Sequence, residues 1–370
     1  MKSINKGNIP DKLYDSDVVL YGAGITGRRI LKLLQPYQVH IKYVIDDDMN
    51  KWGSRLEDAE IISYREFAEY CTQTHNIAVI LTTIYGKTVL KKIRTIDSLS
   101  EIEVYEMYAW LDEAYGLNCL IGGLDNPEEI EEFHERSGLL KTKLSDEESK
   151  RVLDGIYAYM CTRDFNAISD ICTEEEQYFI PEILEAIHGP LNLVDGGAYV
   201  GELYQTMRDH NIELGHWYCF EADEDNYQRL LCQSEKTGLD GIQVCIKKGL
   251  WDREGKLYFD SEQGTASRIV DYETNNQIET VSLDSYFRNR NCNFIKMDIE
   301  GAEYEALRGG METIKRDRPI LTISIYHSVE DFYRIPEYLM KELTGYKYYI
   351  RHHALILCET VLYAIPDELL

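Results

Sequence analysis

Two glycine-rich turns, each standing between an apolar run and a helical pattern, constrain the fold of this chain more than any other feature. The first is Gly22-Ala23-Gly24-Ile25-Thr26-Gly27, and the second is Asp195-Gly196-Gly197-Ala198-Tyr199-Val200-Gly201. A strand that passes through such a turn into a helix opens a doubly wound α/β sheet, because glycine allows the tight turn and the close packing of helix on strand. The sequence therefore predicts two Rossmann-like α/β units.

The apolar runs divide the 370 residues into three parts. Strand-like and helical patterns alternate in the first and last parts, which predicts parallel sheets with crossover helices. Between them lie capped helix starts. We expect a Rossmann-like domain at 1–114, a helical connector at 115–189 and a second α/β domain at 190–370. The last two apolar runs, 346–350 and 360–364, are too closely linked for a crossover and should pair antiparallel at a sheet edge.

The excess of acidic over basic residues limits the kinds of molecule that this protein can bind. Lys plus Arg number 39 and Asp plus Glu number 65, which gives a formal net charge of -26. Such a surface repels phosphate polymers and anionic lipids, so no nucleic-acid partner is expected, although one small phosphorylated ligand can bind in a local pocket. No apolar run is long enough for a membrane span, and the nine cysteines never have CxxC spacing. We therefore expect a soluble, cytoplasmic protein with free thiols.

The first turn has the context of a phosphate-binding site. Asp46-Asp47-Asp48 ends the next apolar run, where a carboxylate can bind ribose hydroxyls while N–H groups at the helix start hold a phosphate. A nucleotide or nucleotide-sugar at Gly22–Gly27 is one expectation, and a tight turn without a ligand is the other. This part has no Tyr-x-x-x-Lys pair or comparable hydride-transfer acid, which argues against NAD(P)-dependent chemistry.

The second turn suits a different ligand, because Asp195 stands directly before the glycines. A carboxylate there would repel a pyrophosphate, but it complements S-adenosylmethionine (SAM), which has no phosphate and carries an ammonium and a sulfonium. Glu221, at the end of the next apolar run, can bind the ribose diol. The alternative is a glycine turn that only packs helix against strand.

A charged cluster follows the apolar run 294–297, where an open α/β sheet places its active site. Lys296 and Asp298 share one face of an extended strand, and Glu300 begins the following turn. His327 ends the next apolar run at the same predicted edge. We expect Asp298 and His327 as candidate proton acceptors, with Lys296 and Glu300 orienting the substrate. The alternatives are ordinary acids at a helix start and a structural histidine.

Residues 190–365 resemble the FkbM-type SAM-dependent methyltransferases. The resemblance rests on the second glycine turn and, in order, on Phe220-Glu221-Ala222-Asp223, Gly249-Leu250-Trp251-Asp252-Arg253-Glu254-Gly255, Thr280–Asp284 and Lys296–Glu303. It implies an α/β class I methyltransferase fold with a seven-stranded mixed sheet, here preceded by the smaller Rossmann-like parallel-sheet domain and the connector. It also implies O-methylation of a hydroxyl.

The resemblance assigns the cofactor to the glycine turn, the acid after the next strand and the end of the third strand. It implies cofactor contacts from Asp195, Gly196, Gly197, Gly201, Glu221, Ala222, Gly249 and Leu250. Asp298 and Glu300 would lie beside the acceptor.

The chain also departs from the family. The usual turn has Val and Asn where this chain has Gly196 and Tyr199, and the usual Glu-Pro is Glu-Ala at Ala222. Many members carry an acid just before the last-strand histidine, where this chain has Ile325 and Tyr326. The identity of the general base is therefore open.

The N-terminal part looks like the Rossmann-like domain of bacterial sugar-modifying enzymes, including the run 46–53. This resemblance implies a nucleotide-sugar or surface-glycan pathway and hence a sugar or glycan acceptor. We expect a SAM-dependent O-methyltransferase acting on a hydroxyl of such a compound. A non-catalytic nucleotide-sugar-binding or scaffold protein is the second interpretation, and an NAD(P)-dependent sugar oxidoreductase or epimerase is the third.

No metal ligand is assigned from the sequence. A divalent metal at Asp298 and Glu300 is left open, because two acids alone do not make a convincing site. The sequence does not fix the oligomeric state, and a homo-oligomer is compatible with it.

Overall fold

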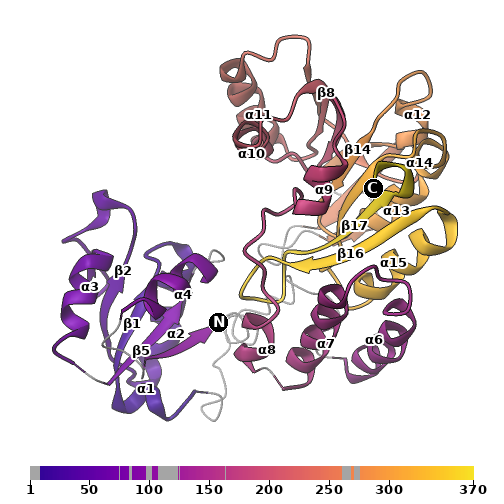
Figure 1. The fold of residues 1–370 in the computed structure, drawn as a ribbon. Coiled ribbons are helices and arrows are strands. Elements are labelled where there is room, and N and C mark those ends of the chain that lie inside the picture. Colours follow the sequence, from indigo (N-terminus) through magenta and orange to yellow (C-terminus); the bar gives the residue numbers. More distant parts are fainter. Residues whose placement is uncertain are drawn as a thin grey trace. The chain divides into compact units, whose positions relative to one another are not determined.

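A computed structural model describes residues 9–74, 76–82, 86–96, 102–106, 124, 126–162, 164–260, 268–270 and 276–370. The chain divides into two compact units, which Figure 1 traces. The first comprises residues 1–119, 158–172 and 354–357, and the second comprises residues 120–157, 173–353 and 358–370. The division expected at residues 114 and 189 stays a prediction.

The first unit is built on a six-stranded sheet with the order β3-β4-β2-β1-β5-β6. Neighbouring strands are parallel except β3 and β4. The order β4-β2-β1-β5-β6 is that of a doubly wound sheet, as the strand pattern predicted. Its elements are α1 (Lys12–Asp15), β1 (Asp17–Tyr21), α2 (Ile25–Leu34), η2 (Gln35–Tyr37), β2 (Ile41–Ile45), η3 (Met49–Lys51), β3 (Arg55–Leu56), β4 (Ala59–Ile62), α3 (Tyr64–Cys71), β5 (Ile77–Leu81), α4 (Gly86–Arg94), β6 (Glu103–Glu106) and α8 (Phe165–Ser169).

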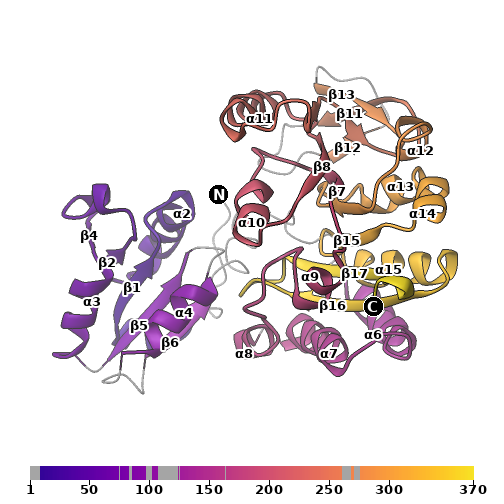
Figure 2. The ribbon, with the colours of Figure 1, turned by 45° about the horizontal axis from the view of Figure 1, so that its top comes forward.

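Side chains of β1 alternate between two cores, because successive residues of a strand point to opposite faces. Val18 and Leu20 belong to one buried cluster together with Ile30 of α2. Val19 belongs to the other cluster together with Phe67 of α3. In Figure 2, β1 accordingly lies between α2 and α3.

The second unit is built on a seven-stranded mixed sheet with the order β16-β17-β15-β14-β7-β8-β9. Six strands run in one direction, and β17 alone runs in the opposite direction, antiparallel to its neighbours β15 and β16. The expected mixed sheet and its antiparallel edge pair are thus confirmed. The strands are β7 (Leu191–Gly196), β8 (Leu214–Phe220), β9 (Gln243–Ile246), β14 (Phe294–Met297), β15 (Ile320–Ser324), β16 (Tyr346–His352) and β17 (Thr360–Pro366).

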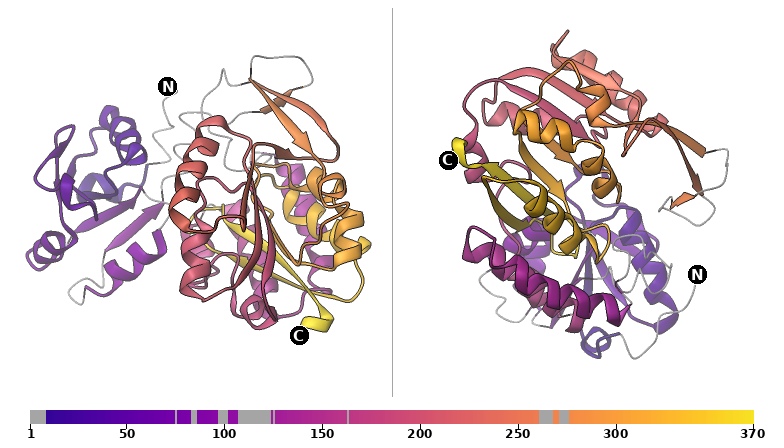
Figure 3. Two further views of the ribbon diagram at one scale, coloured as in Figure 1. Left: turned by 90° about the horizontal axis from the view of Figure 1, so that it is seen from above. Right: turned by 90° about the vertical axis from the view of Figure 1, so that its right-hand side faces the viewer.

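Helices cover both faces of this sheet. Figures 2 and 3 show α10 and α11 on one face and α13, α14 and α15 on the other. The helices of the second unit are α6 (Pro127–Leu140), α9 (Pro181–Ala186), α10 (Leu203–Asp209), α11 (Glu224–Thr237), α12 (Leu283–Tyr286), α13 (Glu303–Arg308), α14 (Met311–Asp317), α15 (Asp331–Glu342) and η4 (Asp367–Leu369), while α7 (Glu147–Thr162) contributes to both units.

A small second sheet, which the sequence did not predict, follows β9. Its order is β10-β13-β11-β12, with β10 parallel and β11 antiparallel to β13. The strands are β10 (Gly249–Leu250), β11 (Gly255–Asp260), β12 (Arg268–Val270) and β13 (Asn276–Val281). This sheet brings Gly249 and Leu250 back toward the ends of the main strands.

The predicted connector is helical, and its larger part packs on the second unit. Phe133 of α6 contacts Phe332 of α15, with ring centroids 5.7 Å apart. Arg351 of β16, only 2% exposed, binds Asp146 at 2.7 Å and Glu182 at 2.9 Å. The connector therefore forms part of the unit that holds the candidate site.

Candidate active site

The second glycine turn and the acidic cluster meet because β7 and β14 are adjacent and parallel. Asp195 is in register with Lys296, so both strands end at the same edge of the sheet. Gly197 has a φ of +71°, and a Cβ there would lie 1.8 Å from the carbonyl oxygen of Asp298. Only glycine fits this contact. The predicted cofactor turn therefore touches the backbone of the predicted catalytic acid.

Asp195 is 1% exposed and has a partner that the sequence did not reveal. Its Oδ1 lies 3.1 Å from Lys296 Nζ, and its Oδ2 accepts from Trp217 Nε1 at 3.2 Å. Lys296 Nζ also donates to the carbonyl oxygens of Gly196 and Gly197, at 3.1 and 2.7 Å. The pair thus fastens the glycine turn to β14, and the ammonium offsets the negative charge that was expected to face the cofactor.

The Glu221 carboxylate closes the glycine turn from the next strand. It is 8% exposed, and its two oxygens accept the backbone N–H groups of Tyr199 at 2.8 Å and Asp223 at 2.9 Å. Burial raises the pKa of Glu221, against the effect of these bonds. A carboxylate has about four acceptor positions, so two remain for a ligand's hydroxyls.

The other residues predicted for the cofactor lie against this turn. A Cβ at Gly196 would lie 2.9 Å from Leu250 Cδ1, and a Cβ at Gly249 would lie 3.8 Å from Ala222 Cβ. Gly201, at the end of the turn, has a φ of +84°. The structure therefore gathers the eight predicted cofactor residues around one strand edge.

Asp298 lies in a network of phenols. Tyr178 donates to its Oδ2 at 2.8 Å and Tyr326 to its Oδ1 at 3.2 Å. Burial raises the pKa of Asp298, but Lys296, His327 and these phenols lower it further, so it lies below its usual range. Tyr178 comes from the connector, with a φ of +71°, and no pattern in the sequence marked it. Tyr326 stands where the resemblance expected an acid.

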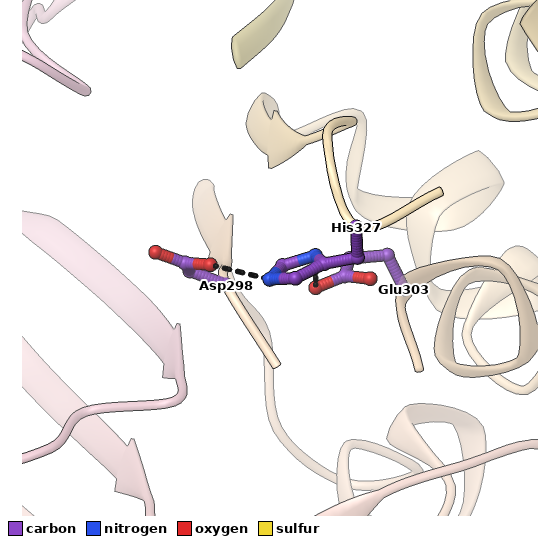
Figure 4. A group of neighbouring side chains, drawn as sticks. All are labelled: Asp298, Glu303 and His327. Carbon is purple, nitrogen blue, oxygen red and sulfur yellow. Dashed lines mark ion pairs between the residues drawn. The ribbon is translucent and has the colours of Figure 1, made fainter. Parts of the chain in front are cut away.

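His327 lies between carboxylates, as Figure 4 shows for Asp298 and Glu303. Its Nε2 is 3.5 Å from Asp298 Oδ1 and 3.7 Å from Glu300 Oε2, and its Nδ1 is 3.3 Å from Glu303 Oε1. Burial lowers the pKa of His327, but Glu303, Asp298 and Glu300 raise it to about 10. The predicted group of Asp298, Glu300 and His327 is thus brought together.

Glu303 was a neighbour in the sequence but was not assigned a role. It is 1% exposed, and its Oε1 accepts from the N–H of Ile299 at 2.7 Å. Two further buried acids surround the group. Burial and then Glu303 raise the pKa of Asp331 to about 6, and burial and then Asp298 raise the pKa of Glu359 to about 7. Glu359 is distant from the group along the chain, and Asp331, four residues after His327, looks in the sequence like an ordinary acid at a helix start.

A groove of about 570 Å³ opens between α10 and α11. It is lined by Val200, Gly201, Glu202, Tyr204, Gln205, Gln228, Arg229, Cys232, Gln233 and Lys236. Gly201, one of the predicted cofactor residues, lines this groove, whereas Glu221 and Asp298 do not.

The first glycine turn has a similar design with one addition. Asp46 accepts the N–H groups of Ala23 at 2.8 Å and Asp48 at 2.9 Å, much as Glu221 does in the second unit. Lys51 Nζ also binds both of its oxygens, at 3.1 and 3.0 Å. The carboxylate that was expected to bind a ribose is therefore already paired with a lysine of the same chain.

Comparison with protein families decides the class of the second unit. Residues 195–348 match the methyltransferase FkbM domain. The C-terminal half therefore contains an FkbM methyltransferase domain. Residues 14–104 match a domain described as C2185-like, N-terminal. Methyltransferases generally use SAM, and the FkbM domain makes this chain a methyltransferase.

A solved structure supports the fold of this chain. A methyltransferase FkbM from Methylobacillus flagellatus KT aligns over 96% of this chain and 94% of its own, with a TM-score of 0.60 and 21% identity. An rRNA methylase from Streptococcus thermophilus aligns over 52% of this chain and 97% of its own at 13% identity, but its TM-score of 0.34 is too low to support an inference. No curated protein matches the chain. Within the described residues, no helix has the length and apolarity to cross a membrane.

Proposed function

We propose that this FkbM methyltransferase domain transfers a methyl group from SAM to a hydroxyl of a sugar or glycan-pathway intermediate. The observation that supports this most is the backbone contact between Gly197 and Asp298. A cofactor lying on the glycine turn would hold its methyl group beside the acid cluster.

In this proposal the cofactor is held by groups that the fold has already fixed. Glu221 binds the ribose hydroxyls through the acceptor positions left free by Tyr199 and Asp223. Gly249 and Leu250 lie near the adenine, and Gly197 and Gly201 allow the ligand to approach the backbone. Asp195 acts through Lys296, which ties the turn to β14.

The transfer is an in-line substitution. The acceptor oxygen forms a bond to the methyl carbon, the carbon–sulfur bond breaks, and the hydroxyl proton leaves. Because the sulfonium is already a good leaving group, the protein mainly aligns donor and acceptor and receives a proton. Asp298, whose lowered pKa keeps it a carboxylate, and His327, 3.5 Å away, are the proposed acceptors of that proton. Because the pKa of His327 is raised to about 10, its ring can accept the proton only after passing its own proton to a neighbouring carboxylate.

A hydroxyl-rich acceptor suits this end of the sheet. Asp298 and the exposed Glu300 offer acceptors, and the phenols of Tyr178 and Tyr326 already orient Asp298. The resemblance of the N-terminal part to domains of sugar-modifying enzymes supports the same class of acceptor. We also propose that the reaction belongs to a cytoplasmic glycan pathway. The domain boundaries near residues 114 and 189 are likewise proposed.

The test is a methyl-transfer assay with isotopically labelled SAM and a panel of free sugars and nucleoside diphosphate sugars. We expect a product with a new O-methyl signal in its NMR spectrum, and a drop in kcat of about a hundredfold or more for Asp298→Asn. Glu312→Gln, an exposed acid of α14, is the matched control and should keep wild-type activity. Transfer only to nitrogen or carbon, or an active Asp298→Asn, would contradict the proposal.

A further inference from the structure

The group around His327 holds buried polar atoms that form ion pairs but no hydrogen bond within the described part of the chain. Both ring nitrogens of His327 and Glu303 Oε2 are buried and make no hydrogen bond to any described residue. The His327 side chain is 8% exposed and that of Glu303 is 1% exposed. Burying polar atoms without hydrogen bonds is unfavourable, so a missing partner is the simplest explanation.

The charges around the ring show which kind of partner fits. Asp298, Glu300 and Glu303 all lie within 3.7 Å of a nitrogen of His327. The nearby lysine, Lys296, is committed to Asp195 and to two carbonyl oxygens. Three carboxylates around one imidazole carry more negative charge than the single charge of a protonated ring can balance, which favours a divalent cation.

The spacing also fits a metal ion. One ligand atom from each of Asp298, Glu303 and His327 lies within 4.8 Å of the other two. Metal–ligand bonds of about 2.1 Å place neighbouring ligands of one ion about 3 Å apart. The distances from His327 Nε2 to Asp298 and Glu300, 3.5 and 3.7 Å, come close to that spacing. Glu303 lies nearest the other ring nitrogen, Nδ1, so the ring or the Glu303 side chain would have to turn for all three residues to share one ion.

We infer that Asp298, Glu303 and His327 form a site for a divalent cation, with the exposed Glu300 as a further carboxylate from the solvent side. Two or three carboxylates with one imidazole suit Mn²⁺ or Mg²⁺. This inference rests on the proposed function, because it places the cation beside the acceptor hydroxyl. There the cation would polarise the hydroxyl and favour loss of its proton. With the ion bound, Asp298 and His327 act as its ligands and not as the proton acceptors.

The experiment is a titration of the full, chelator-treated chain with Mn²⁺, in which electron paramagnetic resonance measures the concentration of free Mn²⁺ at each step. We expect one bound Mn²⁺ per chain and at least tenfold weaker binding in both Asp298→Asn and His327→Gln. Glu312→Gln should bind Mn²⁺ as the wild type does. Circular dichroism checks that each variant is folded. Two ligand variants are used so that, if one of them does not fold, the other still tests the site.

Stoichiometric binding that survives Asp298→Asn and His327→Gln, or no binding to the wild type, would overturn the inference. A parallel calorimetric titration of the metal-free chain with S-adenosylhomocysteine separates the two claims. If that ligand binds and Mn²⁺ does not, the cation site is wrong and the proposed function stands. If Mn²⁺ binds at the three residues and the adenosyl ligand does not, the cation site stands and the proposed function is wrong.

Discussion

At the scale of single residues, Gly197 is the position with least freedom. Its φ of +71° and the 1.8 Å that would separate a Cβ from the Asp298 carbonyl exclude any other residue without backbone movement. We predict that Gly197→Ala lowers the free energy of unfolding by about 1–3 kcal/mol and weakens S-adenosylhomocysteine binding at least tenfold. Gly138→Ala, in the exposed face of α6 with nothing within 4 Å, should change stability by about 1 kcal/mol or less, in the stabilising direction. Thermal unfolding and calorimetry measure both, and equal behaviour of the two variants would contradict the account.

Lys296 is predicted to act on stability through Asp195. Removing the ammonium leaves a carboxylate that is 1% exposed with Trp217 Nε1 as its remaining hydrogen-bond donor. Lys296→Met should therefore cost about 3–5 kcal/mol, and adding Asp195→Asn should recover part of the loss. Urea denaturation of the two single variants and the double variant measures the coupling. Strictly additive losses would show that the pair is not energetically linked.

At the scale of elements, the sequence predicted the seven strands of the second main sheet and four of the six strands of the first, but not β3 and β4, and it predicted the surroundings of the site poorly. The run 294–297 coincides with β14, because buried parallel strands are short and continuously apolar. The small sheet of β10 to β13 was missed, since its pairing depends on contacts between separate segments.

The site shows the same division. The glycine turn, Glu221, Asp298 and His327 were predictable because each ends or follows a parallel strand at one sheet edge. Tyr178 was not predictable, because it reaches Asp298 from the connector, 120 positions away in the chain. Nor was the engagement of Lys296 with Asp195, which required the register of β7 and β14.

The connector helices make the stability of the second unit depend on pH. Burial raises the pKa of Asp146, but hydrogen bonds from Arg351 and Ser149 lower it below its usual range. The stabilisation is therefore present above the unfolded pKa of about 3.9 and is lost as the pH falls through the lower folded value. Asp146→Asn keeps an acceptor for the N–H of Ser149 but removes the charge.

We predict that Asp146→Asn is less stable than the wild type by about 1–2 kcal/mol at pH 6. The difference should shrink at pH 3, where the wild-type carboxyl also becomes protonated. Urea denaturation at the two pH values measures it. A difference that stays constant, or grows on acidification, would show that the charge of Asp146 is not what stabilises this packing.

At the scale of the whole molecule, two sheets of doubly wound order repeat one arrangement with different outcomes. In each sheet, an acid that follows a strand, Asp46 or Glu221, accepts one hydrogen bond from a backbone N–H of the glycine turn. It accepts a second from the backbone N–H of the residue two positions after the acid itself. Lys51 donates to both carboxylate oxygens of Asp46, whereas Glu221 keeps acceptor positions that a ligand can use. The account therefore assigns the adenosyl ligand to the second unit alone.

The most direct test is a calorimetric titration of the full chain with S-adenosylhomocysteine, for the wild type, Glu221→Gln and Asp46→Asn. The two variants are matched, because each neutralises the acid that closes one glycine turn. The account predicts one ligand per chain for the wild type and for Asp46→Asn, and at least tenfold weaker binding for Glu221→Gln. Absence of binding to the folded wild type, or a loss caused by Asp46→Asn and not by Glu221→Gln, would contradict it.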